Sequence, residues 1–323
     1  MNQIELDKVT NITKLQINYR DYPEFMFAMI SAYLEPKEGH YLRKVAGDVV
    51  FRHDRPGYTY KNGVLHSYND QPASNIGNNL KWYKDGLLHR DCDKPAFTKG
   101  NYQVWYRDGK IHREGDLPAI IDENKGSQWW KNGELHREGD KPAYIYGTYQ
   151  KWYRNGLLHR DGDKPAFTKD PYSSAWYREG EIYREGDLPA EINGVTKKWY
   201  LDGRLGRKGD KPAVVIANAR FEWYLEGLLH RDGDLPAVIY RDRNEWYKRG
   251  LRHRDGDGPA VVTAEYESWY KDDVLHRDGD LPAVEHGETK KWYKYGKLHR
   301  DWGRPAFINR YSEQYWVDGE LVN

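Results

Sequence analysis

The sequence predicts an all-β protein: an elongated array of about twelve β-hairpins that forms a twisted antiparallel sheet behind a small N-terminal cap. Three observations lead to this fold class. A sixteen-residue phrase, WYKDGLLHRDCDKPAF at Trp82–Phe97, returns with small changes along most of the chain. Its copies begin every 23 or 24 residues, and such a fixed period indicates a repeat architecture. No helical periodicity of apolar residues is found after residue 58.

The first position of the phrase provides the predicted core. Thr59 occupies it one period before the first tryptophan, and Tyr315 one period after the last. From this position to the proline of the phrase the spacing is always 13 residues, but from the proline to the next copy it is 10 or 11. We therefore expect a solvent-facing turn in the second interval. The core tryptophans are Trp82, Trp105, Trp129, Trp152, Trp176, Trp199, Trp223, Trp246, Trp269 and Trp292.

Each copy is predicted to contain about two antiparallel strands and two turns. An aromatic segment such as YQKWYR is typical of a strand, and the Asp-Gly, Asn-Gly or Glu-Gly that follows predicts a tight turn at positive φ. Asp273 replaces this glycine once, and aspartate accepts that conformation better than most residues. A segment such as LLHR, a DGDKP turn and a short β-branched segment complete the copy. Consecutive Trp and Tyr should point to opposite faces and form two rows.

The predicted domains are an N-terminal cap over residues 1–58 and the repeats over residues 59–323. In the cap, DYPEFMFAMISAYLEP has the start and stop signals of a helix, although its apolar residues also fit a strand. Gly47 and Pro56 keep the nine-residue Gly-to-Pro spacing of a copy, which indicates a decayed repeat.

A second architecture stays open. Steps of 23 and 24 residues alternate over several copies, so two copies make a unit of 47 residues. That length is close to a four-stranded propeller blade, and blades of this kind would close into a ring. An open array of twelve copies would instead be on the order of 100 Å long.

Composition excludes several classes of protein. Lys plus Arg number 51 and Asp plus Glu 50, so the chain lacks the basic excess of a nucleic-acid binder or of a surface held by anionic lipid. No apolar run approaches the ~18 residues of a membrane span, and the first residues lack the pattern of a signal peptide. The single cysteine, Cys92, cannot form an internal disulfide, which favours a reducing, cytoplasmic compartment.

The spacing aromatic-x-x-Gly-x-x-His, as in Tyr83, Gly86 and His89, resembles the MORN repeat and its bacterial variant over roughly residues 59–323. That resemblance implies consecutive β-hairpins in an elongated sheet. The chain departs from the MORN pattern after the histidine, where Arg90 and DCDKPA stand in place of glycine, so MORN lipid binding is not carried over. Repeats of the WYxxGxLHRxGDxPA kind are similar to those of large DNA viruses, phages and some bacteria, and this similarity implies binding to other proteins.

The repeated HRD tripeptide does not predict an enzyme. A kinase also needs a Gly-rich turn, a lysine-bearing strand, a downstream Asn and DFG, none of which is present. HRD or HRE occurs eight times, whereas an active site is a single constellation. We expect no catalytic residue and no cofactor.

The acidic turns raise the question of calcium. Each loop offers few oxygens against the 6–8 that calcium takes, and an arginine stands beside them, so we expect no calcium site. Arg90 should instead pair with an acidic residue of its own or the next loop, and Asp93 should accept backbone N–H groups in its turn. The predicted turn ladder consists of Arg90, Asp93, Arg113, Asp116, Arg137, Asp140, Arg160 and Asp163.

A row of histidines follows the same period. It could bind zinc only if two rows met, and Tyr183 and Gly206 take the position in two copies without any other change, which an essential ligand would not allow. We expect neutral histidines that donate to backbone carbonyls rather than metal ligands. The row comprises His66, His89, His112, His136, His159, His230, His253, His276 and His299.

These features predict a non-enzymatic protein-binding or scaffolding protein that presents an extended surface to a macromolecular partner, because rigid repeats lose little entropy on binding. Recognition should lie in the variable turns, such as TKGNYQ and TKDPYSSA. Two alternatives stay open: a structural component that self-assembles, and an inhibitor that wraps a target enzyme or toxin. A third is a small-molecule pocket beside the cap, near Tyr22, Tyr33, His40 and Tyr41.

Overall fold

The computed structural model describes residues 41–45, 48–52, 58–61 and 64–322. Within these ranges every regular element is a β-strand, which confirms the predicted all-β class. The proposed N-terminal helix, together with Gly47 and Pro56, lies outside the described residues. The chain divides into two compact units, residues 1–157 and residues 158–323, and each is described by itself.

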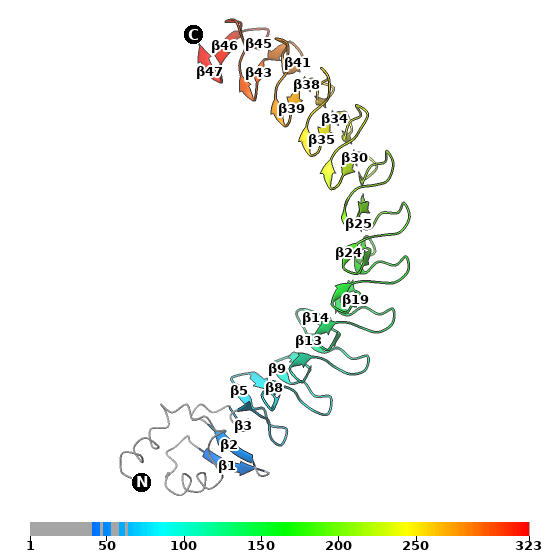
Figure 1. The fold of residues 1–323 in the computed structure, drawn as a ribbon, viewed down its shortest axis with the longest axis vertical. Helices are drawn as coiled ribbons and strands as arrows, with labels where there is room; N and C mark the ends of the chain where they lie inside the picture. Colours follow the sequence, from blue (N-terminus) through cyan, green and yellow to red (C-terminus); the bar gives the residue numbers. More distant parts are fainter. Residues whose placement is uncertain (1–40, 46–47, 53–57, 62–63, 323) are drawn as a thin grey trace, which may run out of the picture. The chain divides into compact units, whose positions relative to one another are not determined.

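Unit 1 begins with a four-stranded antiparallel sheet (Figure 1). The strands β1 (Tyr41–Val45) and β2 (Asp48–Arg52) form a hairpin. β2 then pairs with β3 (Tyr60–Lys61), which forms a second hairpin with β4 (Val64–Leu65). This sheet is separate from the long sheet of the repeats, and its pairing of β2 with β3 differs from the later copies, whose short hairpins form two-stranded sheets of their own.

Each copy contributes one hairpin to a long antiparallel sheet. Within a unit, the second strand of one hairpin pairs with the first strand of the next, as β10 pairs with β13. In unit 1 these strands are β5 (Ser74–Ile76), β6 (Asn79–Lys81), β9 (Phe97–Lys99), β10 (Tyr102–Val104), β13 (Ile120–Asp122), β14 (Gly126–Gln128), β17 (Tyr144–Tyr146) and β18 (Tyr149–Lys151).

In unit 2 the same arrangement continues to the last copy. Its strands are β21 (Phe167–Asp170), β22 (Ser173–Ala175), β25 (Glu191–Asn193), β26 (Thr196–Lys198), β29 (Val214–Ile216), β30 (Arg220–Glu222), β33 (Val238–Tyr240), β34 (Arg243–Glu245), β37 (Val261–Val262), β38 (Tyr266–Ser268), β41 (Val284–His286), β42 (Thr289–Lys291), β45 (Phe307–Ile308), β46 (Glu313–Val317) and β47 (Glu320–Val322).

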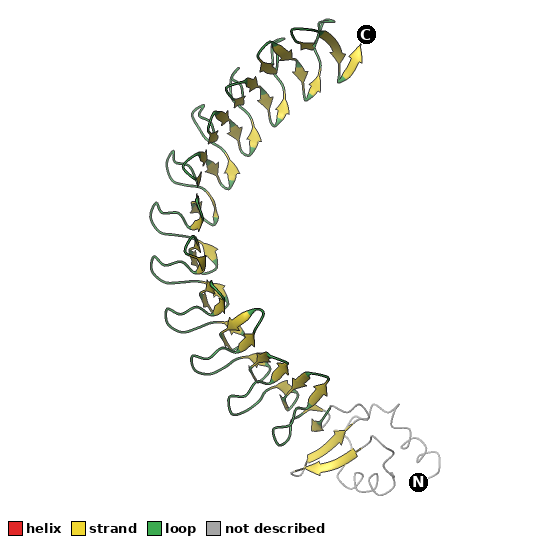
Figure 2. Ribbon diagram, turned by 180° about the vertical axis from the view of Figure 1, so that it is seen from behind, coloured by secondary structure: helices red, strands yellow, loops and turns green. Residues whose placement is uncertain are grey.

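Each copy also forms a second, shorter hairpin around its glycine turn. Long strand-free loops lead from these hairpins to the long hairpin of the same copy and project to one side of the strands (Figure 2). The short strands are β7 (Tyr83–Lys84), β8 (Leu87–Leu88), β11 (Tyr106–Arg107), β12 (Lys110–Ile111), β15 (Trp130–Lys131), β16 (Glu134–Leu135), β19 (Tyr153–Arg154), β20 (Leu157–Leu158), β23 (Tyr177–Arg178), β24 (Glu181–Ile182), β27 (Tyr200–Leu201), β28 (Arg204–Leu205), β31 (Tyr224–Leu225), β32 (Leu228–Leu229), β35 (Tyr247–Lys248), β36 (Leu251–Arg252), β39 (Tyr270–Lys271), β40 (Val274–Leu275), β43 (Tyr293–Lys294) and β44 (Lys297–Leu298).

The tryptophan divides each copy into four strands rather than the predicted two. Trp105 lies between β10 and β11 and belongs to neither. Its N–H donates to the carbonyl of Ala119, next to the long sheet, while its carbonyl accepts the N–H of His112 beyond the short hairpin. The aromatic segment therefore changes partners at the indole, and the two hairpins separate there.

The interval from the proline to the next tryptophan varies by one residue between copies. This variation falls in the turns of the long hairpins, as predicted. Phe97–Lys99 and Tyr102–Val104 enclose two residues, whereas Ile120–Asp122 and Gly126–Gln128 enclose three. In β21 the register shifts between Thr168 and Asp170 instead. The extra residue thus leaves the pairing of the strands on either side intact.

The core is formed by two rows. The tryptophans are buried except for the half-buried Trp223, with Trp105 only 6% exposed, and the alanine after each proline is buried more completely still. The aromatic residue after each tryptophan, Trp130 in one copy and a tyrosine such as Tyr106 in the others, is half-buried on the short hairpin. The alanine row comprises Ala73, Ala96, Ala119, Ala143, Ala166, Ala190, Ala213, Ala237, Ala260, Ala283 and Ala306.

The alternative of a closed propeller is wrong. Blades are separate sheets, but here hydrogen-bonded pairing continues across the junctions between copies, for example from β14 to β17 and from β26 to β29. At the ends of the array, β5 pairs with β6 and through one bridge with Tyr58, and β47 pairs with β46. Within each unit the hairpins therefore form a continuous sheet rather than separate blades.

Candidate functional site

The arginine of each phrase connects two neighbouring copies. Arg113 donates through Nε and Nη2 to the two carboxylate oxygens of Asp93, at 2.8 Å each, and through Nη1 to the carbonyl of Pro118 at 3.0 Å. Its guanidinium lies 3.8 Å from the ring centre of Trp105. The indole N–H of Trp105 donates to the carbonyl of Asp93. We call this arrangement the Trp–Arg–Asp clasp.

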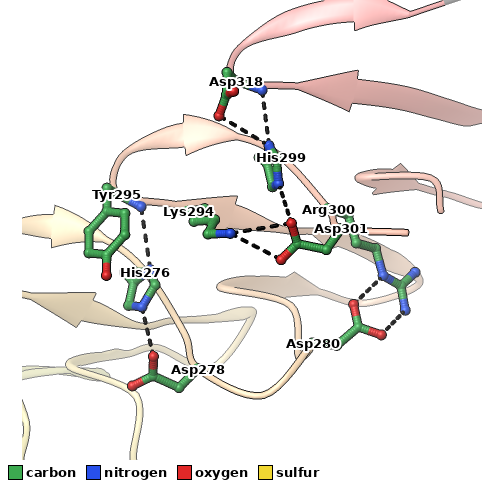
Figure 3. A network of polar contacts seen from close by, with 9 residues as sticks. All are labelled: His276, Asp278, Asp280, Lys294, Tyr295, His299, Arg300, Asp301 and Asp318. Atoms are coloured by element: carbon green, nitrogen blue, oxygen red, sulfur yellow. Dashed lines mark hydrogen bonds and ion pairs between the residues drawn. The ribbon is translucent and has the colours of Figure 1, made fainter. Parts of the chain in front are cut away.

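The same ion pair and stacking recur along both units, and Figure 3 shows the clasp of Arg300 with Asp280. The carboxylate comes from the preceding loop, not from the arginine's own or the next loop as the sequence suggested, because stacking of copies brings that loop alongside. The clasps are Arg90–Asp70–Trp82, Arg113–Asp93–Trp105, Arg137–Asp116–Trp129, Arg184–Asp163–Trp176, Arg207–Asp187–Trp199, Arg231–Asp210–Trp223, Arg254–Asp234–Trp246, Arg277–Asp257–Trp269 and Arg300–Asp280–Trp292.

Other members of the predicted turn ladder occupy equivalent places. Arg160 donates through Nη1 to the carbonyl of Pro165, as the clasp arginines do. Asp140 is exposed in the loop that precedes Pro142. Asp93 accepts its hydrogen bonds from the Arg113 side chain rather than from backbone N–H groups of its turn.

The clasp carboxylates are held in their charged form. Hydrogen bonds from Arg113 are the main cause that lowers the pKa of Asp93, and those from Arg277 do the same for the pKa of Asp257. In some copies a lysine before the proline adds a second cation. Arg90 and Lys94 together hold the pKa of Asp70 well below its ordinary value.

The histidine links its copy to the next turn. His299 Nδ1 accepts the backbone N–H of Asp318 at 3.0 Å, and its Nε2 lies 2.8 Å from the carboxylate of Asp301 (Figure 3). Nδ1 also lies 3.2 Å from the Asp318 carboxylate, so the turn contacts this ring nitrogen through both its N–H and its side chain. With Nδ1 as the acceptor, Nε2 carries the proton that is donated to Asp301. His276 makes the same contacts with the N–H of Tyr295 and the carboxylate of Asp278.

This geometry differs from the predicted donation to a backbone carbonyl. The residue that offers its N–H is the first residue of the next glycine turn, and it adopts a left-handed conformation, with φ of 50° at Asp318. Its N–H is therefore not used within the hairpin. The histidines that accept such an N–H are His66, His89, His112, His136, His159, His230, His276 and His299.

A cation on the short hairpin extends this contact into a cation–carboxylate–histidine triad. Lys294 Nζ lies 3.1 Å from Asp301, which also accepts the histidine proton. The other triads are Lys84–Asp91–His89, Arg107–Glu114–His112, Lys131–Glu138–His136, Lys248–Asp255–His253 and Lys271–Asp278–His276. The repeated HRD and HRE motifs thus supply internal contacts in copy after copy.

One copy in unit 2 lacks the whole triad. Gly206 replaces the histidine, and in the same copy Leu201 replaces the cation and Lys208 the carboxylate. The interpretation that Gly206 stands alone is therefore wrong, although Tyr183 does occur beside an intact Arg178 and Glu185. A Cβ at position 206 would lie 3.4 Å from Leu201 Cδ1, so the leucine side chain is packed against the buried glycine.

Unit 2 also contains carboxylates inside the array. Glu222 is buried and accepts hydrogen bonds from Arg220 and from the hydroxyl of Tyr224 at 2.8 Å. One copy later, Glu245 accepts a hydrogen bond from Tyr247. Burial, followed by this bond, raises the pKa of Tyr247 to about 12. These groups satisfy one another, as buried polar groups in proteins generally do.

The acidic turns offer no ready metal site. Among the residues that the structure describes, no group of three or more His, Cys, Asp and Glu is placed to hold a metal ion. A cleft of about 250 Å³ lies between the loops 113–117 and 137–141, above Trp129. The charged groups that line it already pair with one another, as Arg137 does with Asp116.

The outward side of the short hairpins differs in chemistry between copies. On each hairpin two residues pair across the strands and point away from the tyrosine side, as Leu225 and Leu228 do. We call these positions the outer face. In unit 1 they are mostly charged, for example Lys131 with Glu134, whereas several neighbouring hairpins of unit 2 carry leucine or valine there.

Comparisons with protein-family models, with curated proteins and with solved structures find no match for this chain. The resemblance to MORN repeats therefore stays a prediction from the spacing of Tyr83, Gly86 and His89. In the part of the chain that the structure describes, no helix is long and apolar enough to cross a membrane.

Two features of the site escaped sequence reasoning. The alanine after the proline is the most buried position of each copy, and its strict recurrence after every proline was the signal for it. The joint loss of cation, histidine and carboxylate around Gly206 was also visible once positions seven residues apart were compared.

Proposed function

We propose that this chain is a non-enzymatic protein-binding repeat protein. The observation that supports the proposal is that the arginine, aspartate and histidine of the phrase are engaged in contacts within the protein. The arginine and aspartate form the same ion pair in nine clasps, and most of the histidines contact a carboxylate of their own copy and the next turn, as in Arg113–Asp93 and His299–Asp301. Residues that are already engaged in holding copies together leave the outward-facing, variable positions for recognition.

A rigid array of this kind suits protein recognition. Each clasp joins one copy to its neighbour, so little surface ordering is required when a partner binds. We further propose a cytoplasmic protein, since the single cysteine, Cys92, is exposed and free.

The proposal is tested with the intact chain as bait in an extract of the cells that produce it. We expect stoichiometric capture of one protein, followed by reconstitution of the complex from the two purified components. Light scattering over a range of concentrations gives the matched control. Growth of large assemblies by the chain alone, without a reconstituted complex, would instead identify a self-assembling structural component.

A further inference from the structure

The outer face of unit 2 contains an apolar stripe that crosses four consecutive short hairpins. Its members are Leu201 on β27, Leu225 and Leu228 on β31 and β32, Leu251 on β36 and Val274 on β40. Their exposed fractions run from 38% at Val274 to 50% at Leu228. Contiguous exposed apolar side chains on a protein of this hydrophilicity mark an interaction site more often than chance.

The stripe lies where leucines replace the cations of the repeated triads. Leu201 and Leu225 replace the cations that other copies use in their triads. Removal of the cation leaves the outer face apolar, and in the copy of Leu201 the histidine and carboxylate are lost with it. Stacking of the copies depends on the clasp, which Arg207 and Arg231 retain here, so stacking does not account for these replacements.

The charged side chains at the outward positions of these hairpins have a single sign. The remaining outward positions on these hairpins and the next one are all basic: Arg204, Lys248, Lys271, Lys294 and Lys297. Acidic residues lie at the turns, such as Glu226, and in the loops, where Asp255, Asp278 and Asp301 pair with Lys248, Lys271 and Lys294. Among the described residues Arg204 and Lys297 form no ion pair, so these two cations beside the apolar stripe are the ones open to an acidic partner.

The spacing between side chains of the stripe favours a helical partner over an extended one. Each copy adds two strands, so equivalent side chains recur about every 10 Å. In an α-helix, residues seven apart on one face are separated by about 10.5 Å, whereas same-face residues of a strand recur about every 7 Å. Four hairpins match roughly 20 residues of helix.

We propose that the outer face of unit 2 binds an acidic amphipathic α-helix of a partner protein, with its apolar residues on the stripe and its carboxylates on Arg204 and Lys297. This inference rests on the proposed protein-binding function and assigns its surface. Leu225 and Leu228, directly opposite each other on one hairpin, are the central contact.

The experiment uses the full chain and a synthetic helical peptide of about three heptads, with leucines on one face and glutamates beside them. Binding is measured by fluorescence anisotropy. We expect Leu228→Asp to weaken binding at least about tenfold. The matched control is Leu87→Asp, because Leu87 has the same position in a hairpin of unit 1 and the same 50% exposure. That control should leave the affinity unchanged. Arg204→Glu should also weaken binding, and more so at low salt.

Three controls decide the identity of the occupant. A peptide of the same composition with its heptad pattern scrambled, and one with lysines in place of glutamates, should not bind. Equal binding of either, or equal loss in Leu87→Asp, would contradict the proposal. So would binding to anionic vesicles that depends on Leu228, or dissociation of a homodimer by Leu228→Asp. Should Leu228→Asp still capture the native partner, protein binding would stand and only this surface would be wrong.

Discussion

At the scale of single residues, the clasp explains why arginine and not lysine follows the histidine. The guanidinium of Arg113 meets three groups at once: the carboxylate of Asp93, the carbonyl of Pro118 and the face of Trp105. A planar group with several fixed donors can satisfy all three, whereas an ammonium is a compact point charge. The clasp therefore depends on shape as well as on charge.

We expect Arg113→Lys to lower the free energy of unfolding by about 1–2 kcal/mol, because the bidentate pair and most of the stacking are lost while the charge remains. Urea unfolding followed by tryptophan fluorescence measures this loss. Arg310→Lys is the matched control, since Arg310 is exposed and lies 5.9 Å from the exposed ring of Tyr311. Equal effects of the two substitutions would show that the clasp contributes no more than a surface arginine.

The alanine row makes a second prediction at this scale. Ala213 is fully buried, and its carbonyl accepts the N–H of Trp199 at 2.8 Å. Extra methylene groups there would have to displace the backbone of the core, so we expect Ala213→Leu to cost about 1–3 kcal/mol of stability. Ala219→Leu, in the exposed turn of the same copy, should cost little by the same urea titration. Similar losses for both would contradict close packing at the row.

At the scale of elements, the short hairpins are joined through their glycine turns. The N–H of Gly296 donates to the carbonyl of Leu275 in the preceding hairpin at 2.9 Å, and its φ is 79°. A Cβ at this position would lie 3.0 Å from Val274 Cγ1. Glycine is thus required both for the left-handed turn and for the approach of the neighbouring hairpin.

Two glycine substitutions distinguish the requirement for a left-handed turn from the close approach of the neighbouring hairpin. At Gly203, with φ of 71°, a Cβ would meet no atom within 4 Å, so Gly203→Ala adds only the strain of a left-handed alanine, about 1 kcal/mol. We expect Gly296→Ala to lower the thermal midpoint further, because Val274 must also move. Calorimetry of the two variants measures the difference. Identical midpoints would show that the neighbouring hairpin accommodates the methyl group.

The elements also show how far the sequence could predict the structure. The fixed spacing from tryptophan to proline and the glycine dipeptides were sufficient for the hairpins, because turn geometry and strand alternation are local properties. The change of partners at Trp105 was not, since it depends on hydrogen bonds to Ala119 and His112 that no local pattern encodes. The carboxylate partner of Arg113 was misplaced by one copy, because the direction of stacking is a tertiary property.

At the scale of the whole molecule, stability is a sum over copies and junctions. Each clasp belongs to one junction, and so does each bond between histidine and turn, as in a chain of nearest-neighbour interactions. Arginine hydrogen bonds lower the pKa of the clasp carboxylates Asp93, Asp163, Asp234 and Asp257 alike. Acidification therefore acts on many junctions in the same direction.

Acid should for this reason weaken the array progressively below about pH 4. A carboxylate whose pKa is lower in the folded than in the unfolded chain contributes its full stability above the unfolded value, about pH 4, and loses it as the pH falls further. We expect the urea midpoint to fall steeply below about pH 4. Asp257→Asn removes one such group, so it should lower stability at neutral pH but reduce the further loss on acidification. An unchanged acid dependence in Asp257→Asn would show that this clasp carries no linkage between folding and protonation.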